Sequence, residues 1–331
     1  MDRVARLSPG ERRDLFSETA AVKGTTPAVV EKDFWVTWVL GRIFQAPQLA
    51  PLLMFKGGTS LSKVYGLIER FSEDIDLILD WRVLEGEDPL AERSKTKQDS
   101  LNKAIDEQAE TYIARELLAL IAMALDGVCH CGVDGADGHV INVRYPAAFN
   151  AGYLRPEVRL EIGPLASWLP NEERTISSYA AEAFPNVFER SSCAVRVIKA
   201  ERTFWEKATI LHHEAHRPED RPQPPRYSRH YYDLARMARS PAKDAALADL
   251  ELLANVVEFK QRFYPRGWAR YDLAAPGTMR LVPEGHVLAA IEADYRSMAT
   301  MIFGEQPKIG EVLTAIQGLQ DEINGARQQN S

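Results

Sequence analysis

The sequence predicts an α+β protein in which a small mixed sheet with flanking helices is followed by a helical C-terminal domain. Three patterns predict this class. Residues 52–80 have the pattern of a strand over 52–55, a glycine turn, a helix from Thr59 to roughly Ile68 and a second strand over 74–79. Residues 140–145 and 157–162 alternate apolar and polar side chains, as half-buried strands do. From Ala200 onward, apolar residues recur mostly at helical spacing.

We expect two domains, a core with N-terminal helices over residues 1–195 and a mostly helical domain over residues 196–331. A chain of 331 residues suits one large domain or two modest ones. The formal charge of −7 argues against a protein that coats nucleic acid non-specifically, but it leaves room for an enzyme with a local basic groove. Between Arg196 and Arg239, basic residues outnumber acidic ones.

No membrane span or secretion signal is expected, and the predicted location is the cytoplasm. No apolar run approaches the ~18 residues that a membrane span needs, and the N-terminus is charged at Asp2, Arg3 and Arg6. Three cysteines do not make a disulfide framework.

The remaining elements follow in order along the chain. Ser8-Pro9-Gly10-Glu11 has the pattern of a capped helix start, and helices are expected over residues 8–45. A further helix is expected from about Leu101 to Leu125, and the glycine- and aspartate-rich stretch 127–138 is expected to be a loop or hairpin tip. The C-terminal helices are expected at about 243–263, 284–302 and 309–326, after a proline-rich loop at 217–227.

The segment with the most chemical information joins a glycine turn to a pair of carboxylates. Residues 55–61, Phe-Lys-Gly-Gly-Thr-Ser-Leu, would present backbone N–H groups and a helix N-terminus to a phosphate. Asp74 and Asp76 share one face of the second strand, because side chains at i and i+2 of a strand point the same way. Two such acids repel each other unless a cation lies between them. Divalent metal ions bridge paired carboxylates to nucleotide phosphates, so the pattern indicates a metal-dependent nucleotidyltransferase.

Each feature also has a plainer interpretation. A Gly-Gly pair is often only a turn, and Asp-x-Asp at a strand end is often only a solvated edge. Their order and spacing favour the functional interpretation. The turn is not a Walker A loop, because its Lys56 precedes the glycines.

These residues resemble the AbiEii/AbiGii group of nucleotidyltransferase toxins, which belong to abortive-infection and type IV toxin–antitoxin systems and include the MenT-like tRNA-modifying toxins. The resemblance spans roughly residues 30 to 240 and touches separated motifs in order. It implies a polymerase-beta-type nucleotidyltransferase fold. The matched positions are Lys56 to Leu61, Arg70-x-Ser72-x-Asp74-x-Asp76-Leu77, Glu161, Glu201 with Lys207, and Arg229-x-x-x-Asp233.

The resemblance also implies roles for individual residues. The expected catalytic residues are Asp74, Asp76, Glu161, Lys207 and Asp233, with Asp74 and Asp76 holding Mg²⁺ or, alternatively, Mn²⁺. The expected nucleotide-binding residues are Lys56, Gly57, Gly58, Thr59, Ser60, Ser72 and Arg229. A phosphate group on Ser72 would repel nucleotide phosphates, which suggests a route to inactivation.

General chemistry suggests a specific role, and in some cases an alternative, for four of these residues. Glu161 could orient or deprotonate an attacking hydroxyl, or it could be a strand-edge charge paired with Arg159. Lys56 and Lys207 could neutralise a triphosphate, although Lys207 could instead be a helix-surface lysine paired with Thr203 or Glu206. Asp233 would orient Arg229 or Lys207 rather than hold a metal ion.

The implied function is that of a toxin in a toxin–antitoxin or abortive-infection system. It would transfer NMP from an NTP to an acceptor hydroxyl, with the tRNA 3′ end as the expected acceptor, release pyrophosphate and block translation. The expected partners are tRNA or another RNA acceptor and a cognate antitoxin encoded nearby, with no membrane. The alternatives are NMP transfer to a protein side chain and a non-catalytic NTP-binding sensor. The paired acids favour turnover, because a pure binder has no need of them.

Two other groups of metal-ligand residue types are present. His213-Glu214-Ala215-His216 is one residue short of the zinc motif H-E-x-x-H, and His212 with His216 lacks a third ligand nearby. Cys129-His130-Cys131 with His139 has suitable ligand types but no second Cys-x-x-Cys arm. We therefore expect reduced cysteines and no zinc site.

Overall fold

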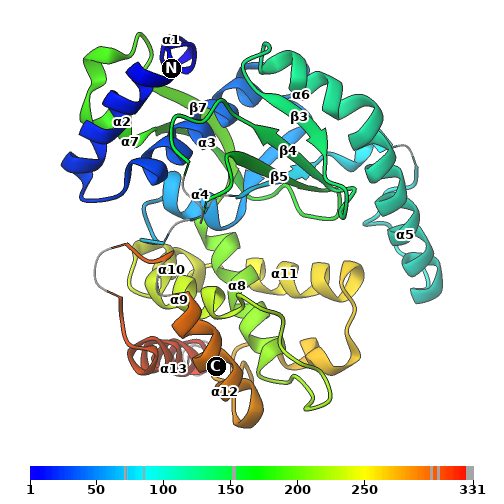
Figure 1. The fold of residues 1–331 in the computed structure, drawn as a ribbon. Helices are drawn as coiled ribbons and strands as arrows, with labels where there is room; N and C mark the ends of the chain where they lie inside the picture. The colour runs from blue at the N-terminus through cyan, green and yellow to red at the C-terminus, as the bar shows by residue number, and fades with distance from the viewer. Residues whose placement is uncertain are drawn as a thin grey trace. The chain divides into compact units, whose positions relative to one another are not determined.

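The structure, a computed structural model, describes residues 1–70, 72, 74–84, 86–150, 154–298, 301–303 and 306–325. The chain divides into two compact units (Figure 1). The sheet unit contains Met1–Val64 and Ser72–Ile198, and the helical unit contains Tyr65–Phe71 and Lys199–Ser331. The sequence did not predict that a short segment between the glycine turn and the acid pair packs with the C-terminal half.

A mixed sheet of seven strands forms the centre of the sheet unit in the described part of the chain. The strand order is β3-β4-β5-β2-β1-β7-β6, with β2 parallel to β5, β1 parallel to β7, and the other neighbours antiparallel. The α+β class with a helical C-terminal half is confirmed, although the sheet is larger than expected. The strands are β1 Leu53–Lys56, β2 Asp74–Leu79, β3 His130–Val133, β4 Val140–Arg144, β5 Glu157–Gly163, β6 Asn171–Ser177 and β7 Ser192–Ile198.

Helices cover the apolar side of this sheet. Alternation along β2 and β5 buries Ile75 and Leu160 completely, and α3 packs against β5 and β7 while α6 packs against β3. The helical elements of this unit are α1 Asp2–Ala5, α2 Pro9–Lys23, α3 Pro27–Gln45, α4 Gly57–Lys63, α5 Lys95–Tyr112, a wider π turn Ile113–Leu117, α6 Leu118–Ala124 and α7 Tyr179–Ala183, with 3₁₀ turns at Trp81–Leu84 and Pro185–Val187.

Two predicted helix ends can be compared with the structure. The capped start is confirmed, because the Ser8 hydroxyl accepts a hydrogen bond from the Glu11 N–H while the Glu11 carboxylate accepts one from the Ser8 N–H. The helix after the glycine turn was expected to reach Ile68 but ends at Lys63. Gly66, with φ +60°, lies in the irregular stretch that follows.

The centre of α3 carries three consecutive charged side chains that are almost fully buried. The Glu31 carboxylate accepts hydrogen bonds from the N–H groups of Ala148 and Phe149, and the Lys32 ammonium donates to the carbonyl of Arg155 at 3.1 Å. Asp33 pairs with a lysine of α4, described below. Because each charge has partners, α3 can carry them through the core at little cost.

The helical unit is built around α8, which packs against α9, α10 and α11, while α9 also packs against α12 and α13. The helix expected over 243–263 is two helices, since the Asp249 side chain caps the N–H of Leu252 and starts a new one. The elements are α8 Ala200–Glu214, α9 Ser228–Met237, α10 Pro241–Leu247, α11 Leu250–Phe263, 3₁₀ turns Gly267–Ala269 and Tyr271–Leu273, α12 Gly285–Ser297 and α13 Ile309–Gly325.

The segment after α4 belongs to the helical unit through backbone contacts. Arg70 forms an isolated antiparallel β-bridge with Ile302, and the Phe303 N–H donates to the Glu69 carbonyl at 2.7 Å. None of the helices in the described residues combines the length and the apolar character needed to cross a bilayer.

Candidate active site

Asp74 and Asp76 lie on one face of β2, at the end where the strand begins. The parallel register of β2 and β5 places Arg159 beside Asp74 and Glu161 beside Asp76. Paired residues in adjacent strands present their side chains on the same face. The three carboxylates and one guanidinium therefore share a face opposite the apolar core, and all four side chains retain contact with solvent.

The glycine turn fits closely against one of these acids. A Cβ atom on Gly57 would lie 1.9 Å from Asp76 Oδ2, and Gly57 has φ +82°. A side chain at this position would be excluded by space and by backbone conformation. Lys56 is in register with Asp76 across β1 and β2, so it lies on the same face of the sheet.

Replacing Gly57 with Ala is therefore expected to displace the Asp76 carboxylate as well as strain the turn. The backbone conformation alone should cost about 1–2 kcal/mol of folding free energy. A displacement of about 1 Å at a reacting group should lower nucleotidyl transfer about 10²-fold. Gly24→Ala is the matched control, since Gly24 has φ +66° and no atom within 4 Å of the added Cβ. Equal effects of the two substitutions on activity, measured with folded protein, would contradict the close-packing interpretation.

The hydroxyl groups of the turn are bonded within the sheet unit. Thr59 and Ser60 are fully buried. Thr59 Oγ1 lies 2.8 Å from Ser72 Oγ and donates to the Asp74 carbonyl, while the Ser60 hydroxyl donates to the Gly57 carbonyl at 2.8 Å. These bonds tie the turn to the start of β2. Any phosphate contact of the turn would therefore come from its backbone N–H groups.

A buried ion pair fixes the far end of α4, and the sequence did not predict it. Lys63 Nζ lies 2.6 Å from Asp33 Oδ1 and also donates to the Ser177 carbonyl at 2.8 Å. Asp33 Oδ2 accepts from the Tyr179 N–H at 2.7 Å. Burial raises the pKa of Asp33, and the Lys63 ammonium opposes that rise. A lysine on a short helix gives no sequence signal of burial, because lysine at such positions is usually solvated.

Arg159 connects the acidic face to a neighbouring loop. Its Nε lies 4.0 Å from Asp74 Oδ1 and 4.0 Å from Glu161 Oε1, whereas its Nη1 lies 3.2 Å from Asp134 Oδ2. The hydrogen bond from Asn142, together with the Ala136 N–H and Arg159, lowers the pKa of Asp134 to about 2. The expected alternative pairing of Glu161 with Arg159 is thus present at the limit of ion-pair distance.

The donor set suits a magnesium ion whose remaining coordination positions are filled by water or by substrate oxygens. Mg²⁺ is held in phosphoryl-transfer sites by one or two carboxylates plus substrate phosphates, rather than by an all-protein cage. Asp74 and Asp76 supply two such carboxylates on one face. In the described part of the chain, no three His, Cys, Asp or Glu side chains converge as a ready-made metal cluster. The residues present therefore supply two of the oxygen ligands that a magnesium ion needs.

A second group of predicted residues lies in the core of the helical unit. Asp233 is fully buried and binds Arg70 with both oxygens, at 2.6 Å to Nε and 2.8 Å to Nη2. Lys207 Nζ lies 2.8 Å from Asp233 Oδ2. Burial would raise the pKa of Asp233, but Arg70 and Lys207 outweigh burial and hold it well below its usual value.

This cluster changes two expectations. Lys207 is buried rather than a helix-surface lysine, so the surface interpretation is wrong. Asp233 orients Lys207, as one alternative proposed, but its second partner is Arg70 and not Arg229. Arg229 is half-buried at the start of α9. Arg70 had no assigned role, although it stood in the matched motif four residues before Asp74.

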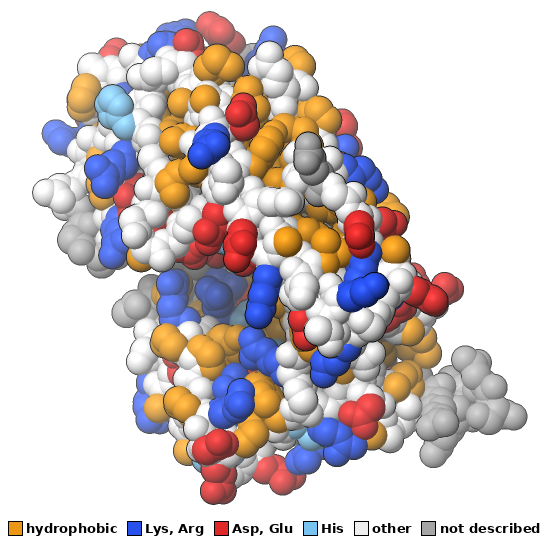
Figure 2. Space-filling model, turned by 90° about the vertical axis from the view of Figure 1, so that its right-hand side faces the viewer, with side chains coloured by type: hydrophobic (Ala, Val, Ile, Leu, Met, Phe, Trp, Pro, Cys, Tyr) orange, Lys and Arg blue, Asp and Glu red, His pale blue; other side chains and the backbone are white. Residues whose placement is uncertain are grey.

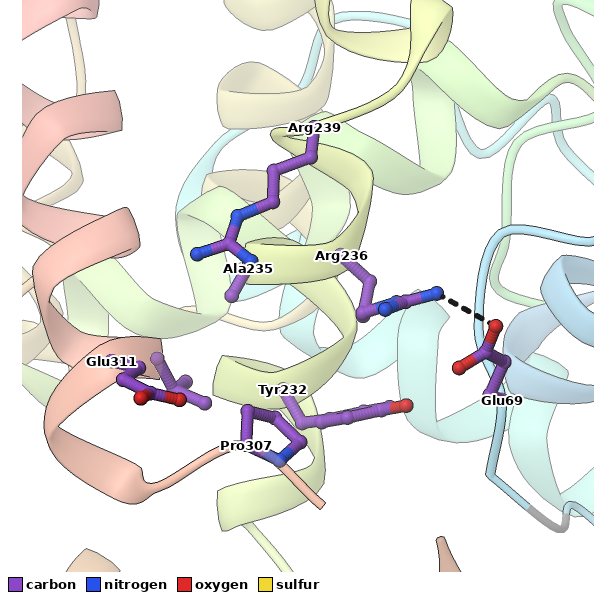
Figure 3. A pocket seen from close by; sticks show the side chains of 8 residues that line it. Glu69, Tyr232, Ala235, Arg236, Arg239, Pro307 and Glu311 are labelled. Atoms are coloured by element: carbon purple, nitrogen blue, oxygen red, sulfur yellow. Dashed lines mark ion pairs between the residues drawn. The ribbon is translucent and has the colours of Figure 1, made fainter. Parts of the chain in front are cut away.

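A cavity of about 330 Å³ opens in the helical unit beside α9 (Figure 3). Arg236 reaches across it to Glu69, with 3.0 Å between the charged atoms. Consecutive residues Glu69 and Arg70 are thus each bound by a side chain of α9, which fixes the segment after α4 to the helical unit. The lining residues are Glu69, Tyr232, Ala235, Arg236, Arg239, Pro307, Glu311 and Val312.

The other candidate metal ligands include side chains that make hydrogen bonds or ion pairs within the protein. The His212 ring binds the Arg270 carbonyl through Nε2 at 2.9 Å and accepts the Arg280 N–H at Nδ1, and burial lowers its pKa to about 4. The Glu214 carboxylate binds the Arg217 guanidinium at 2.6 and 2.7 Å. Within the H-E-x-H segment, Glu214 therefore serves as the ion-pair partner of Arg217.

The cysteines are free thiols, as expected. Cys131 lies in β3, so the stretch expected to be a loop or hairpin tip contains a strand, which pairs antiparallel with β4. Burial raises the pKa of Cys129 to about 12 and that of Cys131 to about 11. Both thiols are therefore protonated at neutral pH when no metal ion is bound.

A paired-carboxylate strand beside a glycine turn offers oxygen ligands for a divalent metal and backbone N–H groups for a phosphate. The family profile described as "Nucleotidyl transferase AbiEii toxin, Type IV TA system" matches residues 38–319. The chain belongs to this AbiEii family, so it is a nucleotidyltransferase toxin of a type IV toxin–antitoxin system. Membership also implies a cognate antitoxin.

Among solved structures, the chain is similar to MenT4, a nucleotidyltransferase toxin from Mycobacterium tuberculosis H37Rv. The two chains share 19% identity with a TM-score of 0.43, over 95% of this chain and 97% of that one. A search of curated proteins gives no significant match.

Proposed function

We propose that this toxin transfers a nucleoside monophosphate from an NTP to a hydroxyl of RNA in the cytoplasm, with the tRNA 3′ end as the expected acceptor. The observation that carries the proposal is the shared face of Asp74 and Asp76, with Glu161 placed beside Asp76 by strand register. Membership of the AbiEii family supports the reaction class.

In the proposed transfer, the residues on the acidic face of the sheet and in the glycine turn have separate roles. The acceptor oxygen would attack the α-phosphorus, the bond from that phosphorus to the bridging β-oxygen would break, and pyrophosphate would leave with the electron pair. Glu161, whose side chain is 45% exposed, would accept the hydroxyl proton and return it to solvent. Asp74 and Asp76 would hold Mg²⁺, which when bound stabilises negative charge on the phosphate oxygens. Lys56 and the backbone N–H groups at Gly57 and Gly58 would bind the triphosphate.

In the helical unit we propose Lys207 and Arg229 as phosphate-binding cations, with Asp233 positioning Lys207.

The distribution of charge supports an RNA acceptor. Acidic and basic residues are equal in number in the helical unit, so the net charge of −7 belongs to the sheet unit. Figure 2 shows Lys and Arg side chains gathered on one face of the helical unit. Exposed arginines of this unit include Arg221, Arg226, Arg239 and Arg266.

Incubation of the purified protein with total tRNA, Mg²⁺ and each α-labelled NTP in turn tests the proposal. We expect label on tRNA from one NTP, and none with Asp76→Ala. Label on protein would replace the RNA acceptor with a protein side chain. Bound nucleotide without any transfer would favour a sensor.

A further inference from the structure

Arg159 is the guanidinium that stands beside the acid pair on the polar face of the sheet. Its Nε lies 4.0 Å from a carboxylate oxygen of Asp74 and 4.0 Å from one of Glu161. These separations exceed hydrogen-bond distance, which is about 2.7–3.2 Å. Attraction is present, but no direct bond is made.

A guanidinium in this place is a potential competitor of a metal ion. It presents five N–H donors in a planar fork that matches carboxylates, and it carries a permanent positive charge. A small rotation toward Asp74 and Glu161 would let Arg159 form the short, charge-assisted bonds that it lacks here. A cation bound in that way would repel a divalent ion and occupy the same oxygens.

A second carboxylate holds Arg159 on its other side. Asp134 Oδ2 lies 3.2 Å from Arg159 Nη1 and 2.8 Å from Asn142 Nδ2, and Asp134 Oδ1 accepts the Ala136 N–H at 2.9 Å. The register of β4 and β5 places Asn142 directly beside Arg159. The Asp134 carboxylate is therefore fixed by three bonds from different parts of the chain.

We propose that Asp134 is a positioning residue that restrains Arg159 and so limits the competition of its guanidinium with the divalent metal for the Asp74 carboxylate. Asn142 supports it by fixing the carboxylate. The inference rests on the proposed function, because it assumes that Asp74 and Asp76 bind a metal ion. Neither Asp134 nor Asn142 would touch the metal or the nucleotide.

The test is the Kd for Mn²⁺ binding to the full chain, measured by electron paramagnetic resonance in the absence of nucleotide and RNA. Asp134→Asn keeps the shape of the side chain but loses its charge, so Arg159 is released toward the acids. We expect the Kd for Mn²⁺ to rise about tenfold, which corresponds to about 1.4 kcal/mol. Arg159→Gln should bind Mn²⁺ at least as tightly as the unaltered protein.

The double variant gives the decisive comparison. If Asp134 acts through Arg159, adding Asp134→Asn to Arg159→Gln should leave the Kd unchanged within about twofold. Asp137→Asn removes a charge from the same loop, where Asp137 caps the His139 N–H and lies 3.7 Å from His139 Nδ1, and should also leave the Kd unchanged. A misfolded Asp134→Asn protein would not be restored by a second substitution at Arg159.

The remaining outcomes would overturn the positioning role of Asp134 or the metal site itself. An equal loss of affinity from Asp134→Asn in both backgrounds, or no loss in either, overturns the positioning role while the metal site stands. No Mn²⁺ binding by the unaltered protein, with label transfer still dependent on added metal, overturns the positioning role as well, because the metal would then need substrate oxygens. No binding and no metal-dependent transfer removes the metal from the proposed function itself.

Discussion

Asp76→Asn is expected to lower nucleotidyl transfer by about three orders of magnitude or more while the chain stays folded. The substitution keeps the volume that packs against Gly57 but removes one of the two charges that would hold the metal. Metal ions contribute several kcal/mol to stabilising charge in such transition states, and each 1.36 kcal/mol is a factor of ten in rate. The measurement is the initial rate of label transfer at saturating NTP, with far-UV circular dichroism as the check of folding.

Glu173→Gln is the matched control, because Glu173 is an exposed acid in β6 of the same sheet. It should leave the rate unchanged. Retention of full activity by Asp76→Asn and by Asp76→Ala would remove the acid pair from the mechanism.

Asp233→Ala is expected to destabilise the helical unit by about 3–5 kcal/mol. Removing one partner of a buried ionic group leaves the other charges without compensation, and here both Arg70 and Lys207 would lose their carboxylate. Denaturant unfolding followed by circular dichroism measures the loss, since this unit is helical. Asp272→Ala, which breaks the exposed pair with Arg270, should leave the stability nearly unchanged.

The same carboxylate makes the stability depend on pH in a defined direction. The pKa of Asp233 is lower in the folded state than its ordinary value of 3.8, so its contribution is present above that value. It is lost progressively as the pH falls below about 4 toward the folded-state pKa. The difference in stability between the unaltered protein and Asp233→Ala should therefore be smaller at pH 3 than at pH 7. An equal difference at both values would contradict the charged state of Asp233.

The acid pair and its strand could be predicted from the sequence because both depend on local periodicity. Alternation in β2 and β5 identified the strands and the faces of Asp74 and Glu161. It could not supply the register that brings Glu161 beside Asp76, because register is decided by the whole sheet. The edge strand β6 is mostly polar and gave no such signal. In β7, Cys193, Val195 and Val197 do alternate, and this pattern could have revealed the strand.

The partners of the charged side chains were harder to predict than the strands. Arg70, Asp134 and Asp33 find partners that lie 163, 25 and 30 residues away in the chain. Charged residues of both signs are common along the sequence, so nothing local selects the right pair. The matched motif contained Arg70, and its position there was the one available signal.

Neither unit of this toxin is a continuous piece of polypeptide. The chain leaves the sheet unit after Val64, contributes seven residues to the helical unit, and returns at Ser72 before leaving again after Ile198. A protease cut or a gene truncation at Ile198 would separate Asp233 from the arginine that neutralises it. A complete helical unit therefore needs residues 65–71 as well as 199–331, and the C-terminal part alone lacks one strand-like segment and one buried cation of its fold.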